Sequence, residues 1–269
     1  MSEKIGVIVV GAGGRMGNRI IHILQETPSM KLCQAIERAD HPSLGKDVGE
    51  IVGLGRLGVP LEGRIRKGDG EVIINFSTPQ ASLESMEFAK ENGLAIVIGT
   101  TGFRPEQMER IRELSKDARC VLAPNMSVGM NVMFRVVQEI ARVLGEEYDI
   151  EILEAHHRLK KDSPSGTAIR LGELIAQAIG RDFKQVGIYG RKGMIGERTR
   201  EEIGMQVIRA GDIVGEHTVL FGGVGERLEI IHRAHSRDNF ARGAIKAALW
   251  VIHQPNGLYD MQDVLGLRG

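Results

Sequence analysis

The sequence is poor in cysteine and in aromatic residues. Only two cysteines, Cys33 and Cys120, occur in 269 residues, and each lies inside an apolar segment that is typical of a strand. Two isolated thiols of this kind indicate buried packing residues in a reducing compartment. They exclude a disulfide framework, and the paired spacing of a zinc site is missing. We therefore expect no metal site.

The sequence also lacks an excess of charge and a long apolar run. Lysine and arginine number 35, and aspartate and glutamate number 35. Without a field of one sign, nucleic acid and anionic membranes are not expected partners. No stretch approaches the ~20 apolar residues of a membrane-spanning helix, and the first residues lack the pattern of a signal peptide. We expect a soluble, cytoplasmic protein that binds small molecules.

A glycine-rich turn follows the first apolar run, Ile5 to Val10, and leads into an amphipathic helical pattern. A strand that turns into a helix beneath a pyrophosphate has no room for a Cβ where backbone and ligand nearly touch. The helix N-terminus then offers N–H groups to the phosphates. We assign cofactor binding to five residues of this turn: Gly11, Gly14, Arg15, Met16 and Gly17. The glycine spacing is one residue longer than the standard fingerprint, so the motif depends on its context.

The next strand candidate supplies that context. A strand is predicted at residues 31–36, and Glu37 follows it directly, twenty residues after Gly17. A carboxylate at this position would meet the ribose hydroxyls of a dinucleotide. Arg38 follows, and a cation beside the ribose can accept a 2′-phosphate. Both NADH and NADPH are therefore expected to fit, and the preference stays open. Ordinary strand-end and surface charges are the alternative for each residue taken alone.

The order of elements predicts two domains. Beyond a loop-rich stretch at 40–70, strands alternate with helices up to residue 123, which favours a parallel sheet covered on both faces. Thr78 before Pro79 is expected to cap one of these helices, and Gly93 to end it. The predicted strands are 72–76, 94–98 and 120–123, and the predicted helices are 79–92 and 105–117.

The character of the sequence changes near residue 125. A long helix at 128–144, a strand at 148–155 and a helix at 164–179 precede three β-rich segments, at 205–210, 215–221 and 226–234. The stretch 181–204 is expected to be an exposed, mobile loop, and a helix at 239–252 to return to the first domain. The expected fold is α/β: a Rossmann-like parallel-sheet domain of residues 1–127 and 237–269 that binds the dinucleotide, and an α+β domain of residues 128–236 with a mixed or antiparallel sheet.

Three loops at the carboxyl ends of the predicted parallel strands complete the cofactor site, because an open parallel sheet binds its ligand there. They are 76–79, 99–102 and 123–126. Small and hydroxyl residues in them allow the nicotinamide ring to approach the backbone, although turn and capping chemistry is the alternative for each loop. The residues assigned to the cofactor are Gly99, Thr100, Thr101, Ala123, Pro124, Asn125 and Met126.

The densest polar cluster, residues 154–168, is the best candidate for an active site. His156 can donate a proton near neutral pH, and the ammonium of Lys160 can hold an anionic substrate and stabilise charge. These two residues are the candidate catalytic pair. A solvated basic loop before a capped helix is the alternative interpretation.

A helix is expected to start within this cluster, with Ser163 as its cap before Pro164. No acidic side chain stands where a capping box would place one, so none competes for the first N–H groups. Ser165, Gly166 and Thr167 can therefore give their donors to a substrate carboxylate.

The glycine turn and the polar cluster together resemble the 4-hydroxy-tetrahydrodipicolinate reductase family, also called dihydrodipicolinate reductase, of the diaminopimelate route to lysine. The resemblance covers nearly the whole chain. Its segments are 11–17, 99–102, 123–129, 154–168 and 257–267.

The resemblance implies hydride transfer from NADH or NADPH to a cyclic, unsaturated dicarboxylate, giving tetrahydrodipicolinate. It implies that His156 is the proton donor with Lys160 as its partner, and that Arg237 approaches the cofactor. Residues implied to hold the substrate are His157, Lys160, Ser165, Gly166 and Thr167. The family is typically a homotetramer built through the sheet of the second domain, so we expect a homo-oligomer. Met126 departs from the family, where many members carry Phe.

Two other functions remain open at this point. A different two-domain dehydrogenase for an amino or keto acid, of the aspartate or homoserine dehydrogenase kind, should lack the arrangement of His156, His157 and Lys160. A cofactor-binding sensor without chemistry should have lost one of His156, Lys160 or Thr167, and none is missing. Whether the hydrated or the dehydrated heterocycle is bound also stays open.

Overall fold

The structure is a computed structural model that describes residues 4–68 and 70–268. Two compact units make up the chain, Met1–Val128 with Arg237–Gly269 as the first and Gly129–Ser236 as the second. Each unit has its own sheet and its own buried core.

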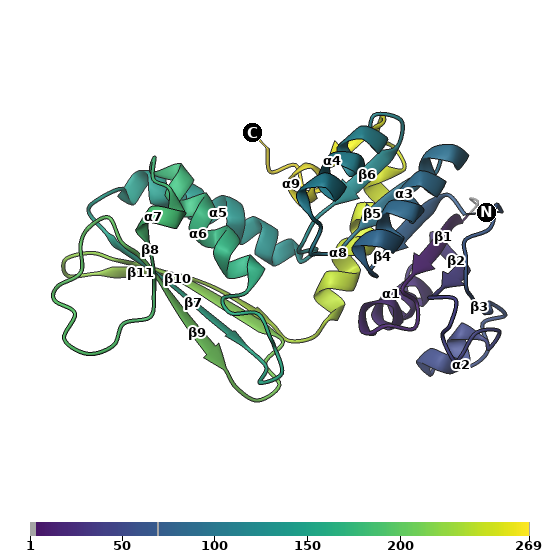
Figure 1. Ribbon diagram of the computed structural model, residues 1–269, viewed down its shortest axis with the longest axis horizontal. Helices are drawn as coiled ribbons and strands as arrows, with labels where there is room; N and C mark the ends of the chain where they lie inside the picture. Colours follow the sequence, from purple (N-terminus) through teal and green to yellow (C-terminus); the bar gives the residue numbers. More distant parts are fainter. Residues whose placement is uncertain (1–3, 69, 269) are drawn as a thin grey trace. The chain divides into compact units, whose positions relative to one another are not determined.

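A seven-stranded sheet forms the centre of the first unit (Figure 1), and all the strand pairs found in it are parallel. In spatial order the strands are β12 (Gly257–Tyr259), β6 (Arg119–Leu122), β5 (Ala95–Ile98), β4 (Val72–Asn75), β1 (Ile5–Val10), β2 (Met30–Ile36) and β3 (Leu61–Glu62). Their apolar runs are nearly continuous because helices cover both faces. The predicted Rossmann-like parallel sheet is therefore confirmed.

The helices of the first unit divide between the two faces of this sheet. Helices α1 (Arg15–Gln25), α8 (Asp238–Val251) and α9 (Met261–Val264) pack into one core, and α3 (Pro79–Asn92) and α4 (Pro105–Leu114) pack into the other. As predicted, the Thr78 hydroxyl accepts a hydrogen bond from the Ala81 N–H, and Gly93 ends α3 with φ 67°. The returning helix expected at 239–252 is α8.

Strand order reverses beside β1, with β2 on one side and β4 on the other. Open parallel sheets bind ligands at such a switch point, outside the carboxyl ends of the strands. The glycine turn follows β1 and the 76–79 loop follows β4, so both predicted cofactor segments lie at this edge.

The loop-rich stretch 40–70 is more ordered than expected. It contains the short helix α2 (Val48–Val52) and strand β3. The Asp47 carboxylate caps α2 through the Gly49 N–H and also accepts the N–H groups of Leu57 and Gly58. These backbone hydrogen bonds, that from Leu57 first, lower the pKa of Asp47. One ionised side chain thus fixes two segments of the loop.

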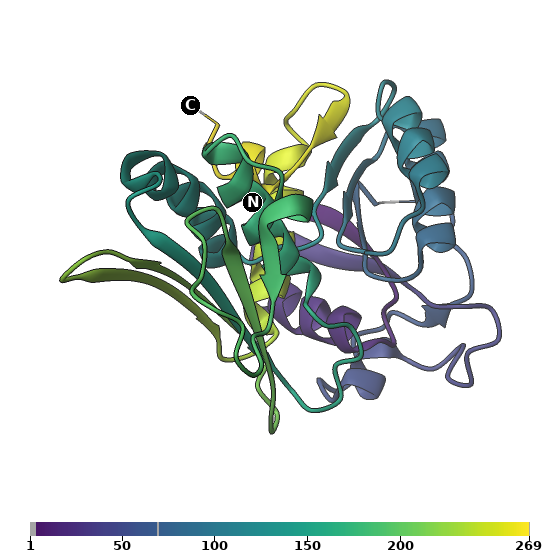
Figure 2. The same ribbon diagram turned by 60° about the vertical axis from the view of Figure 1, so that its left-hand side comes forward.

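The second unit has a five-stranded mixed sheet with its helices on one face (Figures 1 and 2). Its strands in order are β11 (Arg227–Ala234), β10 (Gly215–Gly222), β7 (Asp149–His156), β9 (Ile203–Arg209) and β8 (Gly187–Tyr189). Pairs β8–β9 and β9–β7 are parallel, and β7–β10 and β10–β11 are antiparallel. The helices are α5 (Val128–Leu144), α6 (Gly166–Ala178) and α7 (Phe183–Val186).

One sequence-based expectation is wrong in the second unit. The 181–204 stretch is not simply an exposed loop, because α7 and β8 lie within it and Phe183 is buried in the core. Arg191 bridges Glu151 and Glu202, which ties the stretch to β7.

A second expectation is wrong in the first unit. Cys33 is only half buried, since it lies on the less covered part of β2, whereas Cys120 is fully buried as expected.

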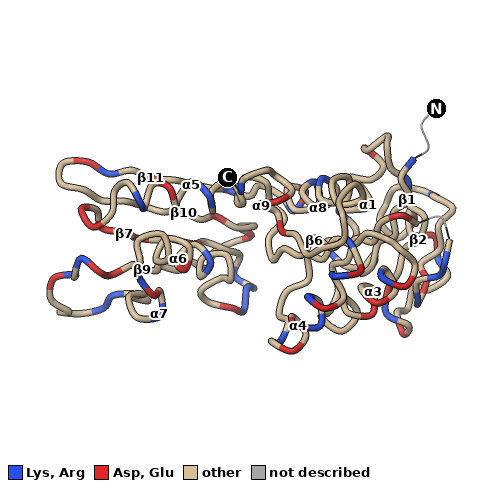
Figure 3. The backbone as a smooth tube through the Cα atoms, turned by 90° about the horizontal axis from the view of Figure 1, so that it is seen from above, with Lys and Arg blue, Asp and Glu red and all other residues tan. Residues whose placement is uncertain are grey.

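Charges of both signs intersperse along the backbone of each unit (Figure 3). Many form local ion pairs, such as that of Lys90 with Asp117. No helix within 4–68 and 70–268 is long and apolar enough to cross a membrane.

Candidate active site

The glycine turn after β1 is shaped by close backbone contacts. Gly11 has φ +81°, and a Cβ there would lie 2.3 Å from the Phe76 carbonyl oxygen. A Cβ at Gly17 would lie 2.1 Å from the Gly11 carbonyl oxygen. Such distances are impossible without backbone movement, so both glycines are required by the turn itself.

The N-terminus of α1 is suited to an anion. Gly14 precedes the helix without a side-chain cap, and the first turn contains no acidic residue. Arg15 and Met16 are the first two helical residues, Arg15 being exposed. The free N–H groups and the positive end of the helix dipole favour a phosphate here.

A cavity of about 700 Å³ lies beside this turn, between the ends of β2 and β4 and the start of α3. Glu37 and Arg38 line it, and the Glu37 carboxylate accepts the N–H groups of Gly13 and Arg38. Apolar residues such as Phe76 and Phe88 and polar residues such as Thr78 and Gln80 line the remainder. The size and mixed lining fit the adenosine half of a dinucleotide.

One cation in this cavity was not anticipated from the sequence. Arg64 lines the same cavity as Arg38, whose guanidinium lies 3.4 Å from Asp40. Arg64 belongs to the segment after β3, and the pairing of β3 with β2 brings it to the site. No local motif marks this arginine, because its position depends on that pairing.

The loops after β4 and β5 are joined by a buried asparagine. The Asn75 side chain is fully buried, and its Oδ1 accepts from the hydroxyls of Ser77 and Thr100. The Ser77 N–H donates to Thr100 Oγ1 at 3.1 Å. The Thr100 hydroxyl is therefore engaged inside the protein, whereas Thr101 is exposed. Gly99 is fixed by sterics, since a Cβ there would lie 2.1 Å from the Phe76 ring.

The loop after β6 places its predicted residues differently. Ala123 and Met126 are buried, Pro124 is exposed, and the Asn125 side chain accepts the Ser127 N–H. Met126 packs into the core of the first unit.

Arg237 directly precedes α8, and no side-chain hydrogen bond caps the helix there. The next residue, Asp238, accepts hydrogen bonds from Nε and Nη2 of Arg19 of α1. The Arg19 hydrogen bond lowers the pKa of Asp238. This ion pair fixes the start of α8, and with it the backbone of Arg237.

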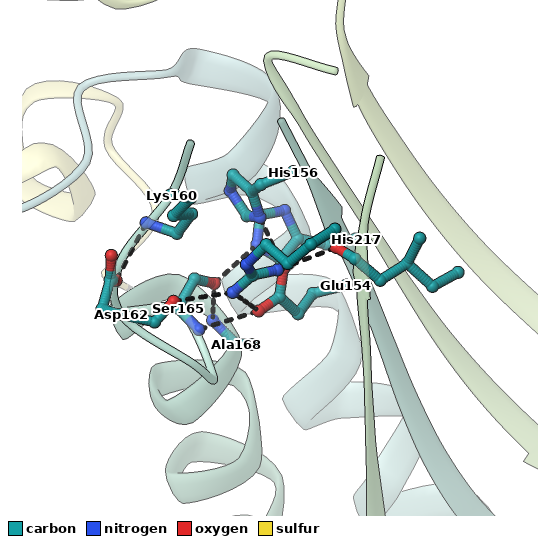
Figure 4. Close-up of polar contacts among 9 residues, drawn as sticks. Glu154, His156, Lys160, Asp162, Ser165, Ala168 and His217 are labelled. Carbon is teal, nitrogen blue, oxygen red and sulfur yellow. Dashed lines mark hydrogen bonds and ion pairs between the residues drawn. The ribbon is translucent and has the colours of Figure 1, made fainter. Parts of the chain in front are cut away.

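The second cluster is built around Glu154 and His156 at the end of β7 (Figure 4). Both point to the helix-covered face of the sheet and both are buried, Glu154 to 1% exposure. His156 Nδ1 lies 2.5 Å from Glu154 Oε2. Arg209 lies on β9, opposite His156 in the register of β7 and β9. Both of its terminal nitrogens donate hydrogen bonds to Glu154, each at 2.8 Å.

Glu154 remains a carboxylate in this position. Burial acts to raise its pKa, but hydrogen bonds from His156, Arg209 and the Ser165 N–H outweigh burial and lower the pKa to about 2. The group is therefore an ionised, fully paired acceptor.

The start of α6 differs from the prediction. Ser165, not Ser163, is the N-cap, and its hydroxyl accepts the Ala168 N–H at 3.2 Å. The helix starts at Gly166, later than expected, and the N–H of its cap Ser165 donates to Glu154 at 2.9 Å. The first turn itself contains no acidic residue, as expected. The Glu154 carboxylate of β7 nevertheless accepts the Ser165 N–H, so this donor is not available to a substrate carboxylate as the sequence had suggested.

Gly166 has no structural reason to be glycine. A Cβ there would meet nothing within 4 Å, and its φ is not positive. The space in front of this helix turn is open to a ligand. Thr167 follows it in the same turn and is half buried.

Lys160 lies on the loop between β7 and α6. Its Nζ lies 2.9 Å from Asp162 Oδ2, and its side chain is 20% exposed. The Lys160 hydrogen bond lowers the pKa of Asp162. His157 begins the turn that holds Lys160, since its carbonyl accepts the Lys160 N–H.

His217 on β10 completes the cluster. It lies opposite Glu154 in register, its ring packs edge-on against His156, and its Nε2 lies 3.3 Å from Ser165 Oγ. Burial, followed by the positive charge of His156, lowers its pKa to about 3. His217 is thus a neutral imidazole at physiological pH.

In the first unit the structure brings the glycine turn, Glu37 and Arg38 to one cavity, whose lining does not include the predicted residues of the 99–101 and 123–126 loops or Arg237. In the second unit it brings His156 and Ser165 together around Glu154. The structure adds four residues that the sequence did not single out: Arg64, Arg209, His217 and Asn75. Glu154 belongs to the polar cluster at 154–168, but the sequence alone assigned it no role. Its separation of two residues from His156 on a strand was a usable signal, because such residues share a face. In the described ranges, no group of three or more His, Cys, Asp or Glu side chains could hold a metal ion.

Two family models cover almost all of the chain. The model for dihydrodipicolinate reductase, N-terminus, matches residues 5–126, and the model for its C-terminus matches residues 129–265. The chain belongs to the dihydrodipicolinate reductase family.

Individual relatives agree with this assignment. A protein of Syntrophus aciditrophicus named 4-hydroxy-tetrahydrodipicolinate reductase is 58% identical, with 97% of this chain and 98% of the relative aligned. A protein of the same name from Geotalea uraniireducens is 54% identical over 98% of this chain and all of the relative.

A solved structure shares the fold. Dipicolinate-bound dihydrodipicolinate reductase from Paenisporosarcina sp. TG-14 superposes with a TM-score of 0.71 at 24% identity, covering 97% of this chain and 98% of the other. The structures therefore share the arrangement of a parallel-sheet domain with a second mixed-sheet domain.

Proposed function

We propose that this protein reduces 4-hydroxy-tetrahydrodipicolinate to tetrahydrodipicolinate with NADH or NADPH, in the biosynthesis of diaminopimelate and lysine. Membership of the reductase family supports this activity. The observation that carries it is the contact of His156 with the ionised, buried Glu154, next to the open helix turn at Gly166.

The proposed roles divide between the units. The dinucleotide-binding domain comprises residues 1–127 and 237–269, and the substrate-binding and oligomerisation domain comprises residues 128–236. A bound NADH or NADPH supplies the hydride. The glycine turn fits the pyrophosphate, and the 700 Å³ cavity with Glu37 and Arg38 fits the adenosine half. The other residues proposed to bind the cofactor are Gly99, Thr100, Thr101, Ala123, Pro124, Asn125, Met126 and Arg237.

Substrate binding is proposed for the start of α6 and the loop before it. The helix dipole and the N–H groups of Gly166 and Thr167 favour a carboxylate, and Ser165 adds a hydroxyl. Lys160 and His157 supply further polar contacts from the loop. Lys160 exchanges its contact with Asp162 for the substrate, because both are carboxylate partners for one ammonium.

His156 is proposed as the proton donor. Protonated imidazole carries hydrogens on both nitrogens, and Glu154 holds the one on Nδ1. The Nε2 proton is then available for transfer to the substrate atom that becomes negative as hydride arrives next to it. Lys160 assists by stabilising that negative charge.

We also propose a homo-oligomer, a tetramer in this family, formed through the face of the second sheet that α5 to α7 do not cover. Leu153, Thr218 and Ile231 lie in one row across that face by register, and Ile231 is 42% exposed. An Ile231→Glu variant should lower the mass measured by light scattering. An unchanged mass would place the interface elsewhere. The proposed location of the protein in the cell is the cytoplasm.

The deciding experiment generates the substrate in place. Purified synthase, pyruvate and aspartate semialdehyde produce it, and the loss of NADH or NADPH absorbance then reports turnover. We expect turnover that requires the synthase and is lost in His156→Gln. Binding of cofactor without turnover would indicate a sensor, and turnover of aspartate semialdehyde alone would indicate another dehydrogenase.

A further inference from the structure

One buried carboxylate connects the proton donor to the substrate-binding turn. Glu154 Oε2 contacts His156 Nδ1, and Oε1 accepts the Ser165 N–H at 2.9 Å (Figure 4). Arg209 bonds to both oxygens and also donates to the Asp162 carbonyl at 2.7 Å. Glu154 and Arg209 therefore contact the backbone of the loop that carries Lys160 at Ser165 and at Asp162.

The hydrogen-bond inventory of Glu154 fixes which nitrogen of His156 holds a hydrogen. An ionised carboxylate only accepts hydrogen bonds, so Nδ1 must donate to it. Neutral His156 is then the Nδ1–H tautomer with a bare Nε2, and its protonated form has the transferable hydrogen on Nε2. A Cβ at Gly215 would lie 3.1 Å from this Nε2, so a glycine leaves room next to it.

We propose that Glu154, held by Arg209, is a positioning residue that sets the tautomer of His156 so that Nε2 is the nitrogen that delivers the proton. This inference rests on the proposed role of His156 as proton donor. Transfer breaks the Nε2–H bond, forms a bond from hydrogen to the substrate, and leaves neutral imidazole with Nδ1–H still donating to Glu154. The carboxylate keeps its charge throughout.

The Glu154→Gln variant tests this with little change in shape. An amide has one oxygen, and the Ser165 N–H is a backbone donor that cannot reverse its role. The amide oxygen should therefore face the Ser165 N–H and Arg209 Nη2, which are two donors, and the amide NH₂ should face His156 Nδ1, where only the hydrogen bond from Arg209 Nη1 is lost. Nδ1 then becomes the acceptor and Nε2 carries the hydrogen of the neutral ring, which is the wrong tautomer for an acid.

Glu151→Gln is the matched control. Glu151 lies on the same strand, also pairs with an arginine, Arg191 at 2.9 Å, and does not contact His156. A general loss of stability caused by neutralising a glutamate in β7 should appear in both variants. A change of tautomer should appear in Glu154→Gln alone.

Two measurements decide the matter. The ¹⁵N shifts of the His156 ring, assigned by their absence in His156→Gln, should show Nδ1–H in the wild type and Glu151→Gln and Nε2–H in Glu154→Gln. With synthase-generated substrate, kcat of Glu154→Gln should fall about 100-fold or more, with NADH affinity within about twofold of the wild type.

Each outcome bears on the inference. An Nε2–H tautomer in the wild type overturns it without any variant, even if Glu154→Gln fails to fold. Unchanged kcat in a folded Glu154→Gln also overturns it. If the wild type shows the Nδ1–H tautomer but no turnover of the synthase product, the proposed function fails while the tautomer assignment stands.

Discussion

Each unit has one helix N-terminus proposed to bind a ligand, and the two use glycine for opposite reasons. In α1, Gly17 is pressed against the backbone, with only 2.1 Å between a built Cβ and the Gly11 carbonyl. In α6, Gly166 faces open space. The first glycine is required by the protein's own packing, whereas no contact within the described residues requires the second to be glycine. Glycine in a motif therefore carries different information at the two places.

The two regions also differ in how they hold charge. The Arg38 side chain next to the glycine turn is 66% exposed and screened by solvent, whereas in the second unit the Glu154 side chain is fully buried and that of its partner Arg209 is only 19% exposed. Removing one partner of a buried pair costs far more than removing an exposed charge. The cofactor edge should thus tolerate substitution better than the polar cluster.

The largest effect is expected for His156→Gln. Loss of the proton donor should lower kcat by about 100- to 10,000-fold, because general acid catalysis contributes that much to typical enzymes. Cofactor affinity should stay within about twofold, since His156 belongs to the second unit and the proposed cofactor residues to the first. Steady-state kinetics with a cofactor titration check both values. Weakened cofactor binding at normal kcat would contradict the role.

The contrast between the glycines can be tested directly. Gly17→Ala should lower the free energy of unfolding by about 2–3 kcal/mol, because backbone must move to admit the methyl group. Gly166→Ala should leave it within about 1 kcal/mol of the wild type, since alanine favours helix and the space is open. Urea unfolding of both variants measures this. Equal destabilisation would remove the distinction.

The buried His217 should make stability depend on pH. Its pKa is about 3 in the folded protein, against the ordinary value of 6.5 for histidine, so the unfolded chain binds a proton first as pH falls. Stability is therefore greatest above about pH 6.5 and declines as pH falls toward 3. Between about pH 7 and pH 5 the wild type should lose about 2 kcal/mol more than His217→Gln. The free energies of unfolding are measured by urea denaturation at both pH values. An equal loss in the wild type and in His217→Gln would show that His217 is not buried as a neutral ring.

The smallest effect is expected at the cofactor edge. Arg38→Ala should weaken NADPH about tenfold more than NADH, since only NADPH carries a 2′-phosphate. Arg64→Ala is the comparison, because Arg64 lines the same cavity from another segment. Fluorescence titration gives the four Kd values. A selective loss in Arg64→Ala alone would move the phosphate contact to that residue.

Local patterns in the sequence predicted most elements of the fold. Strand Ile5–Val10 and helices Pro79–Asn92 and Val128–Leu144 have the predicted bounds, because apolar periodicity and caps act over a few residues. The start of α6 was wrong since Ser163 and Ser165 are equally good caps by sequence. In the structure Ser165 is the cap, and its N–H donates to Glu154, which lies eleven residues away in the sequence.

The sequence by itself determined the parallel-sheet domain, the glycine turn and the polar cluster, because strand, turn and cap preferences are local. Only the tertiary structure decided what surrounds His156. Strands β9 and β10 bring Arg209 and His217 to β7 from more than fifty residues away, through pairing registers that no local pattern specifies. Burial at that meeting point then makes Glu154 a fixed carboxylate and His217 a neutral ring.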